Sequence, residues 1–325
     1  MPYVFGGGSG GAGANLPILA FKDSVTYTPL WTSEVIAYVI GAGGSGGAAR
    51  DSGDWSAGSS GGGAGGTAIS RLTLTASVNY TITIGAGGAY KATTGDDQAI
   101  AGAAGGNSSL SGSDISTMTA NGGTGGAATI AGGASAAGGT GGSASGGNIA
   151  NLTGGAAGTA SANAYQTSGG GGVSLYSVIP TSQVDDGPVY GGSFAYNVPV
   201  NSGYSNIIQP GSEPGNRSDQ GYMATFPFSI GNLHKGYEGS SYEYFAYELP
   251  QGCQGMTPRN TSYSYHGAPF AGGAGDTFGQ TSGSRGGAGV FGSGGGGGTT
   301  AAYATNAHSG AGGDGIVFFI TQTIS

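Results

Sequence analysis

Short runs of apolar and β-branched residues alternate with tracts of glycine along the first third of the chain. Four such runs are rich in Val, Ile, Thr and Tyr, which are typical of β-strands: 25–27, 34–40, 68–75 and 80–84. The second and fourth runs lead directly into the glycine tracts 41–47 and 85–88. The pattern therefore predicts short strands that are followed by glycine-rich segments.

The runs 68–75 and 80–84 are separated by only a few residues, which predicts that they form a hairpin. The chain ends in a similar way, because the glycine tract 310–315 precedes the apolar run 316–320 (IVFFI). We expect this last run to be a buried strand that pairs with the early strands. Such pairing would close one domain at its two ends.

Between residues 102 and 172 the chain consists almost entirely of Gly, Ala, Ser, Thr and Asn. Several glycines here share one frame of three: Gly123, Gly126, Gly132, Gly138, Gly141 and Gly147. Three residues per turn is the period of the polyproline II helix, in which glycine allows neighbouring backbones to approach and bond to each other. We therefore predict a packed bundle of polyglycine II helices within one chain, antiparallel or parallel.

Composition changes near residue 174, where a segment rich in tyrosine and proline begins and continues to 270. The predicted fold is mainly β with little or no α-helix: a short-strand sandwich closed by the N- and C-terminal strands, plus the polyglycine II bundle. We predict one composite domain in four parts: strands with glycine-rich loops (1–98), the polyglycine II region (99–173), the Tyr/Pro-rich insertion (174–270), and the returning glycine-rich region with its closing strand (271–325).

Glycine accounts for 76 of the 325 residues, and charged residues make up 7% of the chain. A glycine-rich coil without a core is often disordered, yet disordered chains usually carry more charge than this. The net charge is −8 and the basic residues are scattered, which argues against a nucleic-acid partner. Cys253 is the single cysteine, so no internal disulfide is possible.

The sequence contains no apolar run long enough to cross a membrane, and we expect no membrane insertion. The first residues, MPYVFGGGSGGAG, lack the basic start and apolar stretch of a secretory signal. We expect assembly in a host cytoplasm followed by release, as happens with virus particles.

Candidate catalytic and ligand-binding motifs are weak. Gly41, Gly43 and Gly46 follow a strand with the spacing of a dinucleotide-binding loop, but no amphipathic helix follows them. Two acidic pairs, at 96–97 and 185–186, lack the spaced ligands of a calcium loop and are interpreted as solvated turns. Three histidines are too dispersed to bind zinc: His234, His266 and His308. Four glutamates leave a glycosidase as an alternative, because two carboxylates from remote loops suffice: Glu213, Glu238, Glu243 and Glu248. We predict no enzyme activity, no cofactor and no metal.

The order of EVIAYVIGAGGSGG, then AISRLTLTASVNYTITIGAGG, then a terminal GAGGDGIVFFI resembles the glycine-rich domain of tailed-bacteriophage tail fibre and tail-tip proteins, the adhesins. The resemblance covers the two ends of the chain and leaves the 174–270 segment unmatched. It implies a virion protein of the distal tail, a homotrimer, other virion tail proteins as partners, and loops that bind a host cell-surface receptor. The receptor would be a saccharide or an outer-membrane protein.

Aromatic residues are the candidates for receptor contact, because tyrosine and tryptophan combine a large flat face with a polar group. The stretch 237–247 (YEGSSYEYFAY) and the loop DSGDWSAG supply them: Tyr237, Tyr242, Tyr244, Tyr247 and Trp55. The alternative is that these rings cover the bundle as its largest apolar side chains. The leading hypothesis is a receptor-binding virion protein; the alternatives are a purely structural shaft or capsid-decorating protein, and an ice-binding protein.

Overall fold

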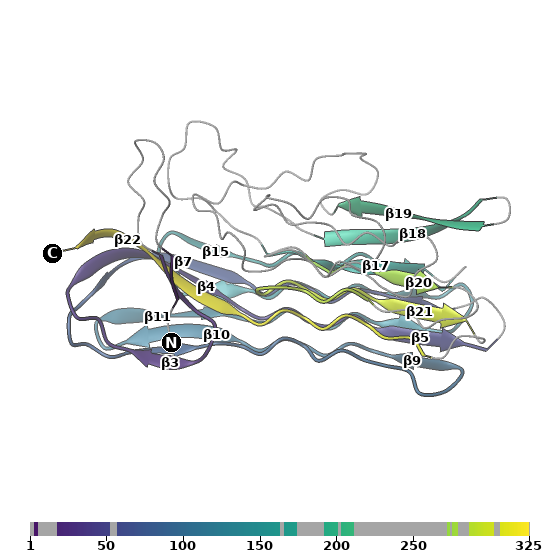
Figure 1. Ribbon diagram of the computed structural model, residues 1–325, viewed down its shortest axis with the longest axis horizontal. Coiled ribbons are helices and arrows are strands. Elements are labelled where there is room, and N and C mark those ends of the chain that lie inside the picture. The colour runs from purple at the N-terminus through teal and green to yellow at the C-terminus, as the bar shows by residue number, and fades with distance from the viewer. Residues whose placement is uncertain are drawn as a thin grey trace.

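The computed structural model describes residues 3–5, 18–52, 57–162, 166–173, 192–200, 203–210, 272–273, 275–278, 286–301 and 306–324. The described part of the chain is all-β and contains no helix, as predicted. Figure 1 shows strands gathered at the two ends of an elongated molecule, with glycine-rich segments running between them. We call the end at the left of Figure 1, which contains β3, β4 and β22, the sandwich end, and the opposite end, which contains β5 and β21, the far end.

The larger sheet at the sandwich end has six strands, in the order β1 (Tyr3–Phe5), β2 (Ile18–Phe21), β22 (Ile316–Ile324), β4 (Ser33–Ile40), β7 (Thr67–Leu74) and β15 (Ala150–Leu152). The last strand of the chain lies between two early ones. Val317 is opposite both Phe21 and Val39. The predicted closure by the two ends of the chain is therefore confirmed.

The second sheet at this end has five strands, in the order β14 (Ala144–Ser145), β11 (Ile115–Ala120), β10 (Ser108–Gly112), β8 (Tyr80–Thr83) and β3 (Val25–Tyr27). The predicted hairpin is wrong, because β7 and β8 belong to different sheets. The residues 75–79 instead carry the chain from one sheet to the other. Leu74 and Tyr80 then lie in the same core cluster, which buries both side chains.

The six-stranded sheet is buried on both faces because its strands alternate between two clusters of apolar side chains. Odd positions of β4, such as Val35 and Val39, pack toward the five-stranded sheet. Even positions, such as Ile36 and Tyr38, pack on the other face, where Tyr38 is stacked on Phe318 with ring centroids 4.6 Å apart. This alternation explains why nearly every residue of β4 is buried.

Three further groups of strands form the far end. One sheet has the order β20 (Asp276–Phe278), β21 (Gly298–Ala301), β5 (Ala48–Asp51) and β9 (Gln98–Ile100). A second sheet has the order β12 (Ala128–Thr129), β6 (Gly58–Ser59), β17 (Gln166–Gly171), β18 (Gly192–Val200) and β19 (Gly203–Pro210). In a third, β13 (Ser135–Ala136) pairs with β16 (Ala160–Ser161). Three of these pairs are parallel: β17 with β6, β20 with β21, and β21 with β5. Of these, β5, β20 and β21 run away from the sandwich end, and β6 and β17 run back toward it.

The segment 41–47 illustrates how the glycine-rich segments are joined. Its N–H groups donate in rotation to three neighbours at 2.9–3.0 Å: Gly41, Gly44 and Gly47 to 60–66, Ala42 and Ser45 to 101–107, and Gly43 and Gly46 to 306–315. Its carbonyls accept from three further segments: 85–91, 121–127 and 293–298. The segment is therefore bonded to six neighbours of the same chain, and each donor direction recurs every three residues.

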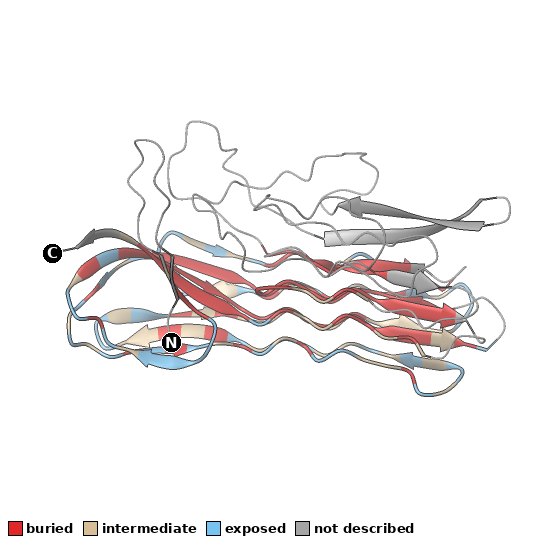
Figure 2. Ribbon diagram, viewed as in Figure 1, coloured by how far each residue is buried: buried red, intermediate tan, exposed pale blue. Residues whose placement is uncertain are grey.

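Glycine is required in these segments because the backbones approach so closely. A Cβ atom at Gly44 would meet the carbonyl of Thr124, and one at Gly62 would meet the carbonyl of Gly44, closer than any real Cβ contact. The segment 60–66, like 41–47, is completely buried. Figure 2 shows this burial extending from the sandwich end through the middle segments, whereas the outer segments are partly exposed.

Candidate functional site

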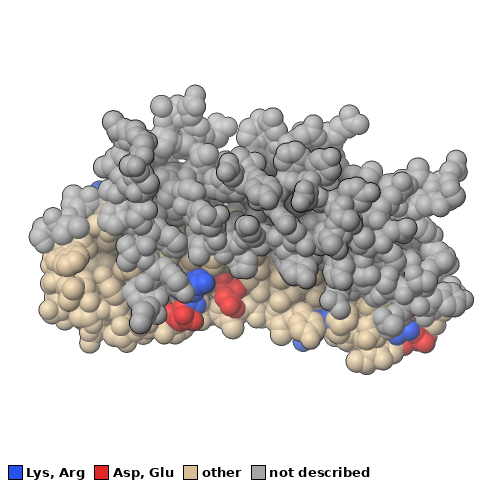
Figure 3. Space-filling view, in the orientation of Figure 1, with Lys and Arg blue, Asp and Glu red and all other residues tan. Residues whose placement is uncertain are grey.

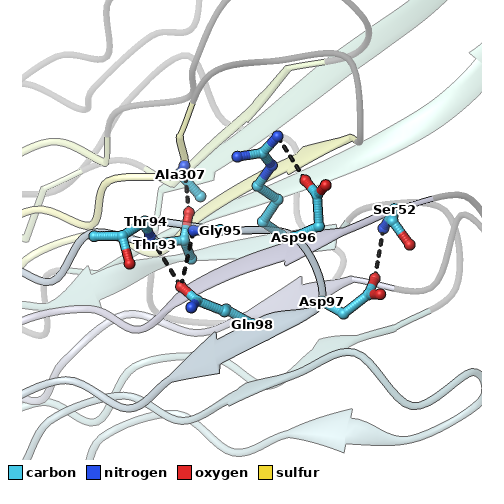
Figure 4. Close-up of polar contacts among 9 residues, drawn as sticks. Ser52, Thr93, Thr94, Gly95, Asp96, Asp97, Gln98 and Ala307 are labelled. Carbon is cyan, nitrogen blue, oxygen red and sulfur yellow. Dashed lines mark hydrogen bonds and ion pairs between the residues drawn. The ribbon is translucent and has the colours of Figure 1, made fainter.

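The far end contains the loop between the segment 85–91 and β9, which is fixed by hydrogen bonds to its neighbours (Figure 4). Thr93 exchanges two bonds with Ala307, its N–H donating to the carbonyl and its Oγ1 accepting from the N–H, both at 2.9 Å. The Gln98 side chain closes the loop, because its Oε1 accepts from the N–H groups of Thr94 and Gly95 at 2.9 and 3.3 Å. The loop 92–98 thus has a defined conformation.

Two exposed carboxylates lie at the tip of this loop. Asp96 Oδ1 is 2.6 Å from Nη2 of Arg50, whose side chain is largely buried. Asp97 adopts a left-handed backbone conformation with φ of 52°, and its Oδ1 accepts from the N–H of Ser52 at 2.8 Å. Hydrogen bonding from Ser52 lowers the pKa of the Asp97 carboxyl below its ordinary value. The Asp97 carboxyl is therefore ionised at neutral pH.

Tyr90, an exposed aromatic residue, lies just before this loop in the sequence and beside the half-buried His308. The Tyr90 side chain is 61% exposed, and its ring centroid is 6.3 Å from that of His308. The two residues are held together by the bridge between Ala92 and His308 and by a bond from Ser309 N–H to the carbonyl of Lys91 at 2.8 Å. An exposed aromatic ring can stack on the apolar face of a hydroxyl-rich ligand, and the carboxylates of the loop that follows can accept hydrogen bonds from its hydroxyls.

The acidic pair at 96–97 lies in a solvent-exposed turn, in agreement with the prediction of a solvated turn. Asp96 is paired with Arg50, and Asp97 bonds to backbone. Within the part of the chain that the structure describes, no group of His, Cys, Asp and Glu side chains is arranged to hold a metal ion. The pair at 185–186 lies outside the described residues.

The glycines with the spacing of a dinucleotide-binding loop have a different role. The N–H groups of Gly41, Gly43 and Gly46 donate to Gly66, Gly313 and Gly310, and all three glycines are buried. The chain continues into β5 rather than into a helix. These N–H groups are used to join backbone segments, which explains the spacing without a phosphate ligand.

The predicted receptor-contact residues lie outside the described residues: Tyr237, Tyr242, Tyr244, Tyr247 and Trp55. The residues on either side of the Trp55 loop, Ser52 and Ala57, lie at the far end, and Ser52 bonds to Asp97. The described residue that precedes the Trp55 loop is therefore bonded to the loop 92–98.

Sequence reasoning missed Tyr90 and His308 as a candidate site. One signal was available. Tyr90 is an isolated aromatic residue in a stretch of Gly and Ala, where no large side chain is needed to fill a core. No comparable signal placed His308, since it lies 216 positions after Ala92, the residue with which it forms a bridge (308 − 92). Its position depends on the bridge to Ala92.

Charge is sparse on the described surface. Figure 3 shows a few small groups of charged side chains on one face, separated by large uncharged areas. In the described residues no helix is long and apolar enough to cross a membrane. On the face shown, the described surface is mostly uncharged. Asp96 and Asp97 are charged residues of the loop 92–98.

The fold defines an all-β protein with a glycine-rich interior. The candidate ligand-binding side chains described above lie outside its strands. Residues 20–322 match the glycine-rich domain family, and the chain belongs to that family. The match includes both the early strands and the closing strand. No curated protein matches the chain.

Proposed function

We propose that the chain is a virion protein of a bacteriophage tail fibre or tail tip, and that its far end binds a saccharide receptor on the host surface. Membership of the glycine-rich domain family and the resemblance of the strand-plus-GAGG junctions support this assignment. The observation that carries it is the loop 92–98, whose conformation is fixed by bonds to Ala307 and Ser52 beside the exposed Tyr90. The protein has no enzyme activity in this proposal.

The scaffold in this proposal is a polyglycine II bundle. Three observations on the segment 41–47 support this conformation. Its hydrogen-bond donors rotate with a period of three residues, it has six bonded neighbours, and a glycine lies at each close approach. Because each segment is bonded to several others along its length, the far-end loops are held at a fixed distance from the sandwich end. A rigid support lowers the entropy lost when loops bind a ligand.

The chemistry of the far end favours a saccharide over a protein receptor. Sugars present apolar C–H faces that stack on aromatic rings, and hydroxyls that bond to carboxylates and amides. Tyr90 supplies a ring, and Asp96 and Asp97 supply acceptors. The prediction that the 237–247 tyrosines and Trp55 contribute further contacts stays part of this proposal.

Binding of the purified, labelled chain to cells of the host, and to its purified lipopolysaccharide, tests the proposed function. We expect Tyr90→Ala to weaken binding about tenfold or more, because it removes an exposed ring from the contact. Ile149→Ala, which shortens a partly exposed side chain on the connection between β14 and β15, is the matched control and should bind normally. Equal binding by wild type and Tyr90→Ala would exclude this surface as the receptor site.

A purely structural shaft or decorating protein is the main alternative. Testing particles that carry Tyr90→Ala for assembly and adsorption separates the two functions. A receptor-binding protein would lose adsorption, and a spacer would keep both. Electron microscopy that placed the chain in the capsid, or outside virions, would contradict a role at the tail.

One observation favours the ice-binding alternative. The segment 137–143 exposes an uncharged side chain at every third position, and the neighbouring segment 121–127 exposes Thr124. The hydroxyls of Thr124 and Thr140 are 3.1 Å apart. Such a regular, uncharged face is suited to ordered water. A thermal-hysteresis assay of the purified chain tests this function, and normal freezing would exclude it.

A further inference from the structure

We propose that Asn121–Gly122 is a latent site of spontaneous deamidation, which the folded chain blocks by fixing the reacting groups in place. An asparagine that precedes glycine is prone to this reaction, because glycine has no side chain to hinder attack by its backbone nitrogen. Asn121–Gly122 is the one Asn-Gly pair of the sequence. It lies where β11 leads into the glycine-rich segment 121–127.

The reaction joins the backbone nitrogen of Gly122 to Cγ of Asn121. The side-chain amide leaves as ammonia and takes the proton that the Gly122 nitrogen gives up, and a five-membered succinimide ring remains. Water then opens this ring at either carbonyl, which yields aspartate or isoaspartate. Isoaspartate carries one additional carbon atom in the backbone, so the spacing of the hydrogen bonds along 121–127 would be lost.

The peptide unit between the two residues is held at both ends. Ring closure turns this unit toward the side chain, and because the unit is planar its carbonyl and its N–H group must move together. The Asn121 carbonyl accepts from Gly66 N–H at 2.9 Å, and the Gly122 N–H donates to Asn107 Oδ1 at 3.0 Å. These partners belong to two different segments, so the turn would break one bond to each.

The side chain of Asn121 is also held. Its Nδ2 donates to Ser143 Oγ at 2.9 Å, and the Asn121 N–H donates to the carbonyl of Ser143 at 2.8 Å. A Cβ atom at Gly122 would overlap the carbonyl of Gly105, which shows how closely the neighbouring backbone limits movement on that side. Cyclisation requires the nitrogen and Cγ in contact and correctly aligned, and these bonds oppose both.

The same arrangement occurs at Asp314–Gly315, a pair that can form the same ring with loss of water. The carbonyl of Asp314 accepts from Gly292 N–H at 2.7 Å, and the Gly315 N–H donates to the carbonyl of Gly85 at 2.9 Å. Asp314 Oδ1 accepts from Gly87 N–H at 2.7 Å. In both pairs the peptide unit and the side chain are thus bonded to neighbouring segments. The inference does not depend on the proposed receptor function.

Peptide mapping by mass spectrometry, on the full chain kept in warm, mildly alkaline buffer, tests the block. We expect Asn121 to stay intact in the folded wild type and to convert in the same chain unfolded in urea. Asn107→Ala removes the acceptor of the Gly122 N–H and should raise the rate in the folded chain about tenfold or more. Asn107→Asp keeps an acceptor and should restore the slow rate. Asn148→Ala, which removes the comparable acceptor of Arg71 N–H, is the matched control and should react as the wild type does.

The second pair, measured in the same samples, distinguishes local release from general unfolding. Isoaspartate at Asp314–Gly315 should stay at the wild-type level in Asn107→Ala, because that variant frees only the contacts of Gly122. Equal acceleration at both pairs would overturn the proposal, as would equal rates for Asn107→Ala and the wild type. Conversion of the folded wild type as fast as the unfolded chain, or an unfolded chain that stays intact, would also overturn it.

Discussion

The two ends of the molecule and the glycine-rich segments between them are stabilised in different ways. At the sandwich end, large side chains from two sheets fill a common core, which includes Tyr80, Met118 and Phe319. Between the ends, the buried residues of 41–47 and 60–66 have no large side chain at all. Their backbones contact each other directly and exchange hydrogen bonds with several neighbours.

This difference predicts different tolerance to substitution. A side-chain core can lose a methylene group and relax around the gap, at a cost that depends on the cavity. A core made of backbone has no empty space to accept even one added methyl group. The glycine-rich segments should therefore be damaged by additions, and the sandwich by deletions.

The largest effect is expected for Gly62→Ala. The added Cβ would overlap the carbonyl of Gly44, so the segments 60–66 and 41–47 would have to separate and break their shared hydrogen bonds. We expect a loss of more than about 3 kcal/mol of stability, or no folded protein. Gly95→Ala is the matched control, because the nearest atom to its Cβ is Gln98 Nε2 at 3.4 Å. Thermal unfolding followed by circular dichroism measures both, and equal midpoints would refute the backbone-packed core.

The next largest effect is expected in the sandwich. Phe319→Ala removes a ring that is 1% exposed and makes edge contact with Phe21 at a centroid distance of 5.4 Å. We expect a loss of about 3–5 kcal/mol in the free energy of unfolding. Phe319→Leu keeps much of the volume and should cost clearly less. A similar loss for the two variants in denaturant titrations would mean that this core does not depend on packing.

A smaller effect is expected for Tyr80→Phe, which keeps the buried ring and removes its hydroxyl. That hydroxyl accepts from Thr75 N–H and donates to Asp114 Oδ2, both at 2.8 Å, at the crossing between the sheets. Leaving Thr75 without its partner should cost about 1–2 kcal/mol. The exposed Tyr90→Phe serves as control and should leave the unfolding midpoint unchanged. If Tyr80→Phe also unfolds at the wild-type temperature, water replaces the lost bond.

The smallest effect is expected from pH. Hydrogen bonding lowers the pKa of Asp97 through Ser52, and that of Asp114 through Thr75 and Tyr80, below their ordinary value of 3.8. A lowered folded-state pKa adds stability above pH 3.8 that is lost as the pH falls through the folded-state value. Burial raises the pKa of Tyr27 and Tyr80 above 10.0, so their contribution is lost as the pH rises beyond 10.0. Unfolding midpoints measured across pH should fall at both extremes.

Asp97→Asn tests the acidic side of this profile. The variant keeps an oxygen that can accept from Ser52 N–H and cannot titrate, so its stability should decline less between pH 4 and lower values than that of the wild type. An identical decline would show that other carboxylates control acid unfolding.

Five of the 22 strands, all at the sandwich end and rich in β-branched and aromatic residues, were predicted from local sequence. The runs 25–27 and 34–40 correspond to β3 and β4, and 316–320 begins β22. The sequence could not show whether β7 and β8 pair with each other. A short connection is compatible both with pairing in one sheet and with crossing to another. Burial of Leu74 and Tyr80 in one cluster decides between them.

The candidate site was predicted less well than the fold. Trp55 and the tyrosines of 237–247 lie outside the described residues, and their role stays a prediction. Tyr90 was missed because an aromatic residue in a strand or loop can be buried or exposed. The local sequence does not decide between the two. Tyr38 is buried and Tyr90 is exposed, although each lies beside a glycine tract.

The sequence by itself determined that this protein is all-β, that its first and last strands pair, and that glycine replaces large side chains over much of its length. These properties follow from local propensity and from the size of each residue. Only the tertiary structure decided which glycine segments are neighbours, which sheet each strand joins, and that Tyr90 meets His308. The physical reason is that glycine segments with a repeat of three residues are nearly interchangeable, so their partners are chosen by the packing of the whole chain.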